Sequence, residues 1–147
     1  MTLITSQAIN LSLRGQTQTE ILNELAEMAV SLGKVSDPQT FALALAAREL
    51  QGSTGFGDSV ALPHTRSACV IAPGILVART PHSVAWHASD DEPVFCWLCL
   101  MIPEQGAVAD TQLLSTLCRK MVNPDFTAAL KTRDERGILE LILSAIS

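Results

Sequence analysis

The sequence has 147 residues, of which 48% are hydrophobic and 17% are charged, and its formal net charge is −5. This length and apolar content suffice to bury a core and exclude a disordered chain. Lys and Arg are scattered rather than clustered, which argues against a nucleic-acid-binding surface, whereas an acidic protein favours a partner with a basic face.

The apolar segments are too short to anchor the chain in a membrane. The longest run, residues 94–102, falls far short of the roughly 20 residues that a membrane-spanning helix needs. Residues 1–11 lack a basic leader before an apolar stretch and so do not resemble a signal peptide. We therefore expect a cytoplasmic protein without direct membrane insertion.

The first third of the chain predicts a short strand and two helices. Residues 9–13 alternate between apolar and polar, which is typical of a strand. Thr17 and the glutamate three residues later have capping-box spacing, and the helix that follows is expected to end at Gly33. Asp37 and the proline after it predict the start of a second helix, which Gly52 ends.

The sequence changes character between residues 52 and 66. Three glycines in six residues predict a loop with unusual backbone angles or close backbone approach. The apolar residues 60–62 then predict a short strand that leads into Pro63 and His64. Further strands are predicted at residues 75–78, 84–86 and 94–102, the last of them buried on both faces.

The last third predicts three helices. The first covers residues 111–122 with Asp110 as its N-cap, the second covers residues 124–130, and the third begins at Asp134. No linker or internal repeat interrupts the chain. The element order therefore predicts one α/β domain over residues 1–147, with a small mixed β-sheet flanked by helices.

The four cysteines are predicted to be core thiols and not metal ligands. Cys96 and Cys99 form a C-x-x-C motif, but it lies inside a predicted strand. Residues three apart in a strand point to opposite faces, so the two thiols cannot bind one ion. No second pair has ligand spacing, and we expect no metal site.

His64 differs in its setting from the other two histidines. It follows a predicted strand and a proline that fixes the backbone, and a glycine-rich loop lies upstream. A reactive imidazole needs such a rigid mount and access to a partner. The alternative is a half-buried histidine that merely ends a strand. His82 and His87 lie in polar, turn-rich surroundings and are expected to be surface residues without a role.

Residues 48–66 together resemble the signature of the fructose/mannitol family of enzyme IIA domains. These domains belong to the bacterial phosphoenolpyruvate-dependent sugar phosphotransferase system. In that family a helix ends in Arg-Glu, a turn rich in Gly, Ser and Thr follows, and a strand delivers a Pro-His whose imidazole is phosphorylated. Here these elements are Arg48-Glu49, residues 52–57, and residues 60–64.

The resemblance implies that His64 is the nucleophile of a protein-histidine phosphotransferase component. It would accept phosphate from phospho-HPr or a similar carrier and yield it to a cysteine of an enzyme IIB, without a cofactor. Neutral imidazole is a good nucleophile near pH 7, and phosphoryl transfer needs mainly positioning and charge stabilisation. Arg48 would hold phosphate oxygens with its forked donors; the alternative is a solvated arginine that favours a helix C-terminus.

Three further residues are candidates for the site. Thr54 and Gly55 could bind phosphate through a hydroxyl or backbone N–H groups, although the loop could equally be just a turn. Many family members place a second histidine opposite the phosphorylated one, and the matching position here is Asp110. Its carboxylate could accept a hydrogen bond from the His64 ring, would repel incoming phosphate, or could serve only as a helix N-cap.

The leading hypothesis is a phosphocarrier for uptake of a fructose- or mannitol-type sugar. A second hypothesis is a regulatory enzyme IIA-like protein whose phosphorylation state controls its binding to other proteins. A hydrolase that uses His64 as a general base is less favoured, because no Ser or Cys has a recognisable nucleophile setting.

Overall fold

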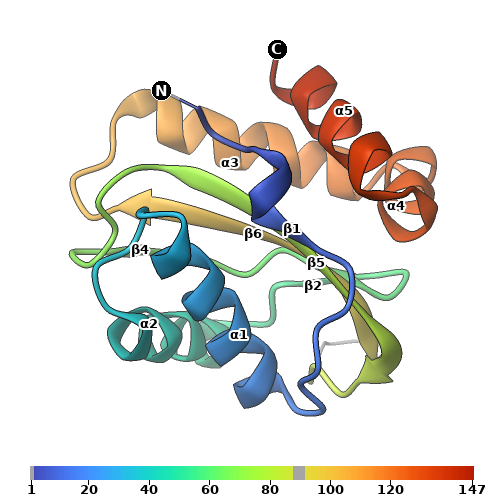
Figure 1. Cartoon of the computed structure of the whole chain (residues 1–147), viewed down its shortest axis with the longest axis horizontal. Helices are drawn as coiled ribbons and strands as arrows, with labels where there is room; N and C mark the ends of the chain where they lie inside the picture. Colours follow the sequence, from blue (N-terminus) through green and yellow to red (C-terminus); the bar gives the residue numbers. More distant parts are fainter. Residues whose placement is uncertain (1, 88–91) are drawn as a thin grey trace.

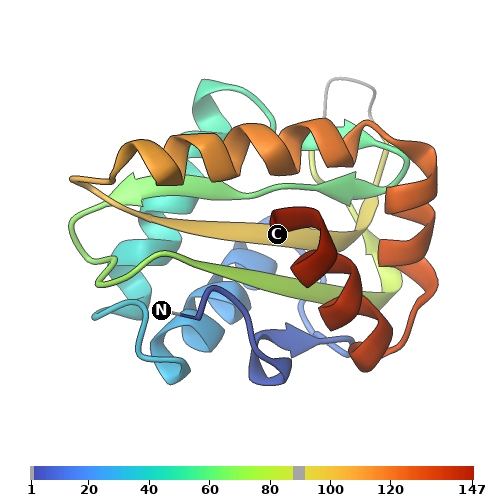
Figure 2. The same ribbon diagram turned by 90° about the horizontal axis from the view of Figure 1, so that it is seen from above.

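A mixed β-sheet lies between two layers of helices in the computed structural model, which describes residues 2–87 and 92–147 (Figure 1). Figure 2 shows the molecule from the side on which a long helix near the C-terminal end of the chain runs along the strands. The predicted α/β class, with a mixed sheet flanked by helices, is confirmed. One layer contains α1 (Gln18–Ser31) and α2 (Pro38–Gln51), and the other contains α3 (Val108–Met121), α4 (Pro124–Thr132) and α5 (Glu135–Ile146).

The sheet is organised around its longest buried strand, β6. The strand order is β1-β5-β6-β3-β2, and β4 also pairs with β6. β5 is antiparallel to β6, β3 and β4 are parallel to it, β1 is parallel to β5, and β2 is antiparallel to β3. After a 3-10 turn, η1 (Ser6–Ala8), the strands are β1 (Ile9–Asn10), β2 (Gly55–Gly57), β3 (Val60–Ala61), β4 (His64–Ser67), β5 (Gly74–Val84) and β6 (Val94–Pro103).

β6 forms the centre of the hydrophobic core. Its residues from Cys96 to Met101 are completely buried, because helices cover both faces of the strand. Trp97 packs against Trp86 with ring centroids 5.6 Å apart. The prediction of a strand buried on both faces is confirmed.

The helix ends confirm the capping signals in the sequence. The Thr17 hydroxyl accepts from the Glu20 N–H, and the Asp37 carboxylate accepts from the Thr40 N–H. Gly33 follows α1 with a φ of 74°, a left-handed conformation that glycine adopts without steric cost. Within residues 2–87 and 92–147, no helix combines the length and apolarity needed to span a membrane.

Two strands differ in extent from the sequence prediction. β1 stops at Asn10 because its side chain accepts from the Ser12 N–H, which turns the chain. The segments predicted as strands at residues 75–78 and 84–86 are one strand, β5, which ends at Val84. A register shift between Arg79 and Val84 hides this continuity, because a bulge interrupts the alternation of apolar and polar residues.

β3 and β4 form one interrupted strand along the same edge of β6. Val60 is aligned with Cys96 and His64 with Leu100, so the register is the same on both sides of the break. The break falls at Leu62 and Pro63, which belong to neither strand. In the described part of the chain β4 pairs only with β6, so its outer edge is open.

Candidate functional site

The break between β3 and β4 fixes the backbone around His64. Proline has no N–H to donate, but the Pro63 carbonyl accepts from the Leu100 N–H at 3.0 Å and holds the chain beside β6. The Leu62 N–H donates to the Thr54 carbonyl at 3.0 Å. The Leu62 carbonyl, which lies outside both strands, is the group that the His64 ring contacts.

The hydrogen bond of the His64 ring fixes its tautomer. Nδ1 lies 2.8 Å from the Leu62 carbonyl oxygen, which can only accept, so Nδ1 carries the proton. In the neutral ring Nε2 then holds the free lone pair. Burial lowers the pKa of His64 below its usual 6.5; the Leu62 hydrogen bond raises it, and the nearby Arg48 charge lowers it further. The ring is therefore neutral at pH 7 and nucleophilic at Nε2.

His64 faces a hollow of about 530 Å³ at the open edge of the sheet. The hollow is bounded by α2 on one side and α3 on the other, and it contains two arginines beside the histidine. The side chains that line it come from α2 (Ala44, Ala47, Arg48, Gln51), from β4 (His64, Thr65, Arg66), from β6 (Ile102) and from α3 (Leu114).

Arg48 reaches this hollow from the last turn of α2. Its Nη1 donates to the Gly52 carbonyl at 2.7 Å, which closes the end of the helix and holds the guanidinium in place. Because the Arg48 charge lowers the pKa of His64, the guanidinium lies within electrostatic reach of the ring. The structure thus brings together the two residues that the sequence singled out first.

Glu49 and Thr54 form a half-buried contact behind the hollow. The Thr54 hydroxyl donates to Glu49 Oε2, and the Thr54 N–H donates to Oε1 at 3.0 Å. Burial raises the pKa of Glu49, although both bonds from Thr54 and the charge of Arg48 act to lower it. These bonds tie the end of α2 to the strand segment that carries His64.

The candidate phosphate-binding groups of this turn already have protein partners. The Thr54 hydroxyl and N–H both bind Glu49, and the Gly55 N–H donates to Ser53 Oγ at 3.0 Å. Neither Thr54 nor Gly55 is among the described residues that line the hollow. Gly55 is the first residue of β2, which pairs antiparallel with β3.

Asp110 does not have the position expected from the sequence. The sequence predicts it as the N-cap of its helix, but α3 begins three residues earlier than predicted, with Ala107 as N-cap. Alanine has no side-chain acceptor, and the Asp110 carboxylate instead accepts from the Ala107 N–H at 3.0 Å. No hydrogen bond between Asp110 and His64 occurs among the residues that the structure describes, and Asp110 does not line the hollow at His64.

Arg66 is the residue of this hollow that sequence reasoning missed. It lies two positions after His64 on β4, so both side chains share one face of the strand. Its Nη2 donates to Thr111 Oγ1 at 2.7 Å, at the start of α3. The shared face could be recognised only if residues 64–67 were predicted as a strand. Their four polar side chains show no alternation of apolar and polar residues that would predict one.

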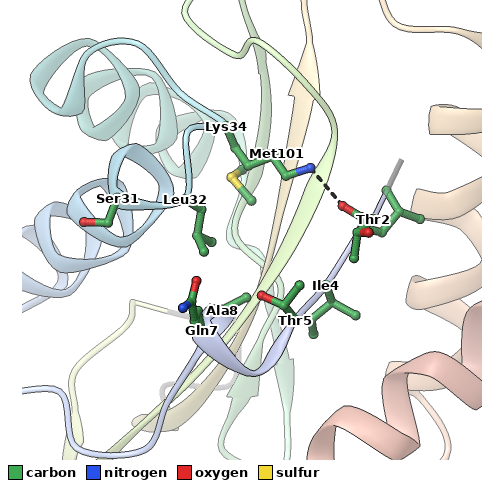
Figure 3. Close-up of a pocket in the computed structure, with 10 residues that line it drawn as sticks. Thr2, Ile4, Thr5, Gln7, Ala8, Ser31, Leu32, Lys34 and Met101 are labelled. Atoms are coloured by element: carbon green, nitrogen blue, oxygen red, sulfur yellow. Dashed lines mark hydrogen bonds between the residues drawn. The ribbon is translucent and has the colours of Figure 1, made fainter.

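A second hollow lies between the N-terminal segment and the end of α1 (Figure 3). Lys34 is its one charged lining side chain among the described residues, and its Nζ donates to the Thr2 carbonyl at 2.9 Å. No histidine, cysteine or carboxylate is among those lining residues. This hollow therefore offers no nucleophile comparable to His64.

Two cysteines and the other two histidines do not line the hollow at His64. Cys96 and Cys99 are fully buried, and burial raises the pKa of each thiol to about 12, so neither is a thiolate at pH 7. His82 and His87 are exposed, and neither lines the hollow at His64. In the described part of the chain, no cluster of three or more His, Cys, Asp or Glu residues could hold a metal ion.

Comparisons with known proteins identify the family of the chain. A family model described as "Phosphoenolpyruvate-dependent sugar phosphotransferase system, EIIA 2" matches residues 2–145. The PTS system fructose-like EIIA component of Escherichia coli K12 is 37% identical over 147 residues, which is 100% of this chain and 99% of that protein.

Two solved structures have the same fold. Nitrogen regulatory protein IIA-Ntr from Neisseria meningitidis aligns with a TM-score of 0.86 and 25% identity, over 95% of this chain and 96% of that one. The complex of enzyme IIAMTL and phosphorylated enzyme IIBMTL from Escherichia coli gives a TM-score of 0.77 over 96% of this chain and 97% of the matched chain. At 20% identity, this second likeness shows the fold alone.

The titration of His64 tests its environment directly. We expect its Cε1–H resonance, assigned by its loss in a His64→Gln variant, to titrate with a midpoint below 6.5, because burial disfavours the charged ring. The unfolded chain then binds more protons than the folded one just below pH 6.5, so the contribution of this group to stability falls as the solution is acidified. A midpoint above 6.5 would contradict the proposed burial.

Replacing Thr54 tests the role of its hydroxyl. Thr54→Val leaves Glu49 Oε2 without its partner, and we expect the free energy of unfolding at pH 7 to fall by about 1–3 kcal/mol in chemical denaturation. Thr65→Val is the control, because the Thr65 hydroxyl is exposed and its contact with the Arg66 carbonyl is 3.4 Å long. We expect a change of about 0.5 kcal/mol or less there, and equal losses in both variants would be evidence against a specific bond.

Proposed function

Because the chain belongs to the EIIA 2 family of the phosphoenolpyruvate-dependent sugar phosphotransferase system, we propose that His64 is its phosphorylated residue. Domains of this family are phosphotransferase components that carry a phosphohistidine and pass the phosphate to EIIB. The single observation that carries the proposal is the His64 ring, whose Nδ1 proton is held by Leu62, so that Nε2 holds the lone pair, and which lines a hollow together with Arg48.

The transfer onto His64 follows from this tautomer. The Nε2 lone pair attacks the phosphorus of a phosphohistidine on an HPr-like carrier; the donor N–P bond breaks, and its electron pair returns to the donor ring. The acceptor ring keeps its Nδ1 proton and becomes positively charged as the new N–P bond forms. The Leu62 carbonyl stabilises this charge through the 2.8 Å hydrogen bond. Transfer to the sulfur of an EIIB cysteine reverses these changes on the ring.

Arg48 is proposed to bind the phosphoryl oxygens. Its Nη1 is used by the Gly52 carbonyl, which leaves other donors of the planar guanidinium for an anion in the hollow. Its charge also favours the neutral form of His64 before transfer, as the direction of its pKa effect indicates. Phosphoryl transfer depends mostly on such positioning and charge stabilisation.

Asp110, Thr54 and Gly55 are not given a phosphate contact in this proposal. The Nδ1 proton of His64 already goes to Leu62, so the ring does not require Asp110 as an acceptor. The Asp110 carboxylate completes the first turn of α3, and Thr54 supports the end of α2 through Glu49. Gly55 is proposed to serve the turn in which its N–H donates to Ser53.

The proposed partners are an HPr-like phosphocarrier and an enzyme IIB domain or subunit, acting in the cytoplasm on uptake of a fructose- or mannitol-type sugar. The name of the fructose-like EIIA relative supports this class of sugar. Enzyme IIAMTL, which shares the fold, forms a complex with phosphorylated enzyme IIBMTL, and this complex supports the second partner.

A regulatory function is the second candidate. It is favoured by the likeness to IIA-Ntr, a nitrogen regulatory protein, with a TM-score of 0.86 and 25% identity. In this alternative, the phosphate on His64 would change the charge and shape of the surface around the hollow. A partner would then bind only one of the two phosphorylation states.

Labelling with phosphoenolpyruvate tests the proposed residue. Incubation of the protein with phosphoenolpyruvate, enzyme I and HPr is expected to give an acid-labile phosphoprotein, because phosphoramidates hydrolyse in acid. His64→Ala is expected to abolish labelling, and His82→Ala serves as the control because His82 lies outside the hollow. A wild-type protein that stays unlabelled with several HPr-like carriers, or a His64→Ala protein that is still labelled, would overturn the proposal.

Capture of partners with the two forms of the protein separates transport from regulation. The phosphorylated protein is expected to transfer its label to a purified enzyme IIB of the fructose or mannitol type, and His64→Ala is expected to transfer none. Stable capture of a protein unrelated to enzyme IIB by one phosphorylation state, without label transfer to any such enzyme IIB, would support the regulatory candidate instead.

A further inference from the structure

Arg66 lies on the same face of β4 as His64 and lines the same hollow, but neither the sequence motif nor the proposed transfer assigns it a role. Residues two apart in a strand are separated by roughly 6.6 Å along the chain. An arginine side chain is long enough to cover this distance, and both side chains line the hollow that a phosphoryl group on His64 would enter. His64 therefore has a guanidinium available from α2 and a second one from its own strand.

We propose that Arg66 is a second phosphate-binding residue of this site, which contacts the phosphoryl group from the side of α3 while Arg48 contacts it from the side of α2. The inference rests on the proposed function of His64. Its ligand is a dianionic phosphoryl group in transit between two proteins. Such a group has more oxygen acceptors than one guanidinium satisfies, and planar forked donors suit it well.

The Arg66 guanidinium is held in place by the start of α3. Nη2 donates to Thr111 Oγ1 at 2.7 Å, which leaves its other donors free of that bond. Nη1 lies only 2.6 Å from where a Cβ of residue 106 would be, and the Asp110 carboxylate lies 2.9 Å from the same point. Any side chain at Gly106 would therefore displace one of the two groups, so this glycine makes room for both.

The charge of Arg66 is not neutralised by a close ion pair. In the part of the chain that the structure describes, no carboxylate lies within 4.0 Å of its guanidinium nitrogens. The Asp110 carboxylate and the Arg66 guanidinium both lie close to Gly106, but the carboxylate accepts its hydrogen bond from the Ala107 N–H. Arg66 is also exposed, so an incoming phosphate on a partner protein can reach it. A positive group in this setting gains more from an anion than one already paired.

Arg48 and Arg66 approach the histidine from different elements, α2 and β4, and line the same hollow. The guanidinium of Arg66 is directed to the start of α3 by Thr111, so it is expected to act on the phosphoryl oxygens from that side. Its replacement should weaken the steps that involve phosphate.

Thr111 is the residue that orients Arg66. Its Oγ1 accepts from Nη2 at 2.7 Å and fixes the direction of the guanidinium at the start of α3. The Asp110 carboxylate shares the space beside Gly106 with this guanidinium but forms its hydrogen bond with the Ala107 N–H. Thr111 is thus a positioning residue for Arg66.

The test measures phosphoryl transfer from phospho-HPr to the full chain. We expect Arg66→Gln to lower the second-order rate constant by about 100-fold, as for loss of one preorganised donor to developing charge. It should also shift the ³¹P resonance of the phosphorylated His64, which a merely structural contact would not do. Arg119→Gln is the control, because Arg119 is exposed on α3, lies outside the hollow and carries the same charge.

Two further variants keep the outcome decisive if Arg66→Gln folds poorly. Arg66→Lys retains the charge and should restore part of the rate, and Thr111→Val should reduce it mildly by releasing the guanidinium. A labelled wild-type protein whose Arg66 variants transfer within about threefold of Arg119→Gln, with an unchanged ³¹P resonance, would overturn this inference alone. Absence of labelling in the wild type, or labelling of His64→Ala, would instead overturn the proposed function.

Discussion

The site depends on one hydrogen bond, from the Nδ1–H of His64 to the Leu62 carbonyl. The bond is possible because the strand along β6 is interrupted at Leu62 and Pro63, so a main-chain carbonyl is available beside the ring. A carbonyl can only accept, and this asymmetry decides which nitrogen holds the proton and which one reacts. The hollow and the supporting contact between Glu49 and Thr54 surround a ring whose tautomer is already determined by that acceptor.

Much of the fold could be predicted from local chemistry. Thr17, Asp37 and Asp134 each cap a helix with a side-chain oxygen, and Gly33 adopts the left-handed conformation that ends α1. Each of these signals depends on residues only a few positions apart in the sequence, so it can be recognised without knowing the tertiary structure. β6 was equally visible, because a strand covered on both faces needs a continuous apolar run. The motif around His64 also identified Arg48, which the structure places at the same hollow.

The parts that escaped prediction depend on contacts between distant segments. β4 has polar residues and is a strand only because β6 lies beside it, so the alternation that pairs His64 with Arg66 was hidden. The sequence predicts Asp110 as the N-cap of its helix, but α3 starts earlier, at Val108, and the Asp110 carboxylate accepts from the Ala107 N–H. The role of Thr54 likewise required knowing where Glu49 lies. In each case tertiary packing, and not local propensity, determined the outcome.

The open edge of β4 has a consequence beyond catalysis. An unpaired strand edge is a template on which a second molecule can add its own strand, which is a route to aggregation. Here the edge is only four residues long, is preceded by Pro63, and carries the charged Arg66. Each of these features discourages strand addition. Pro63 and Arg66, which flank the histidine on either side, thus also act against self-association of the chain.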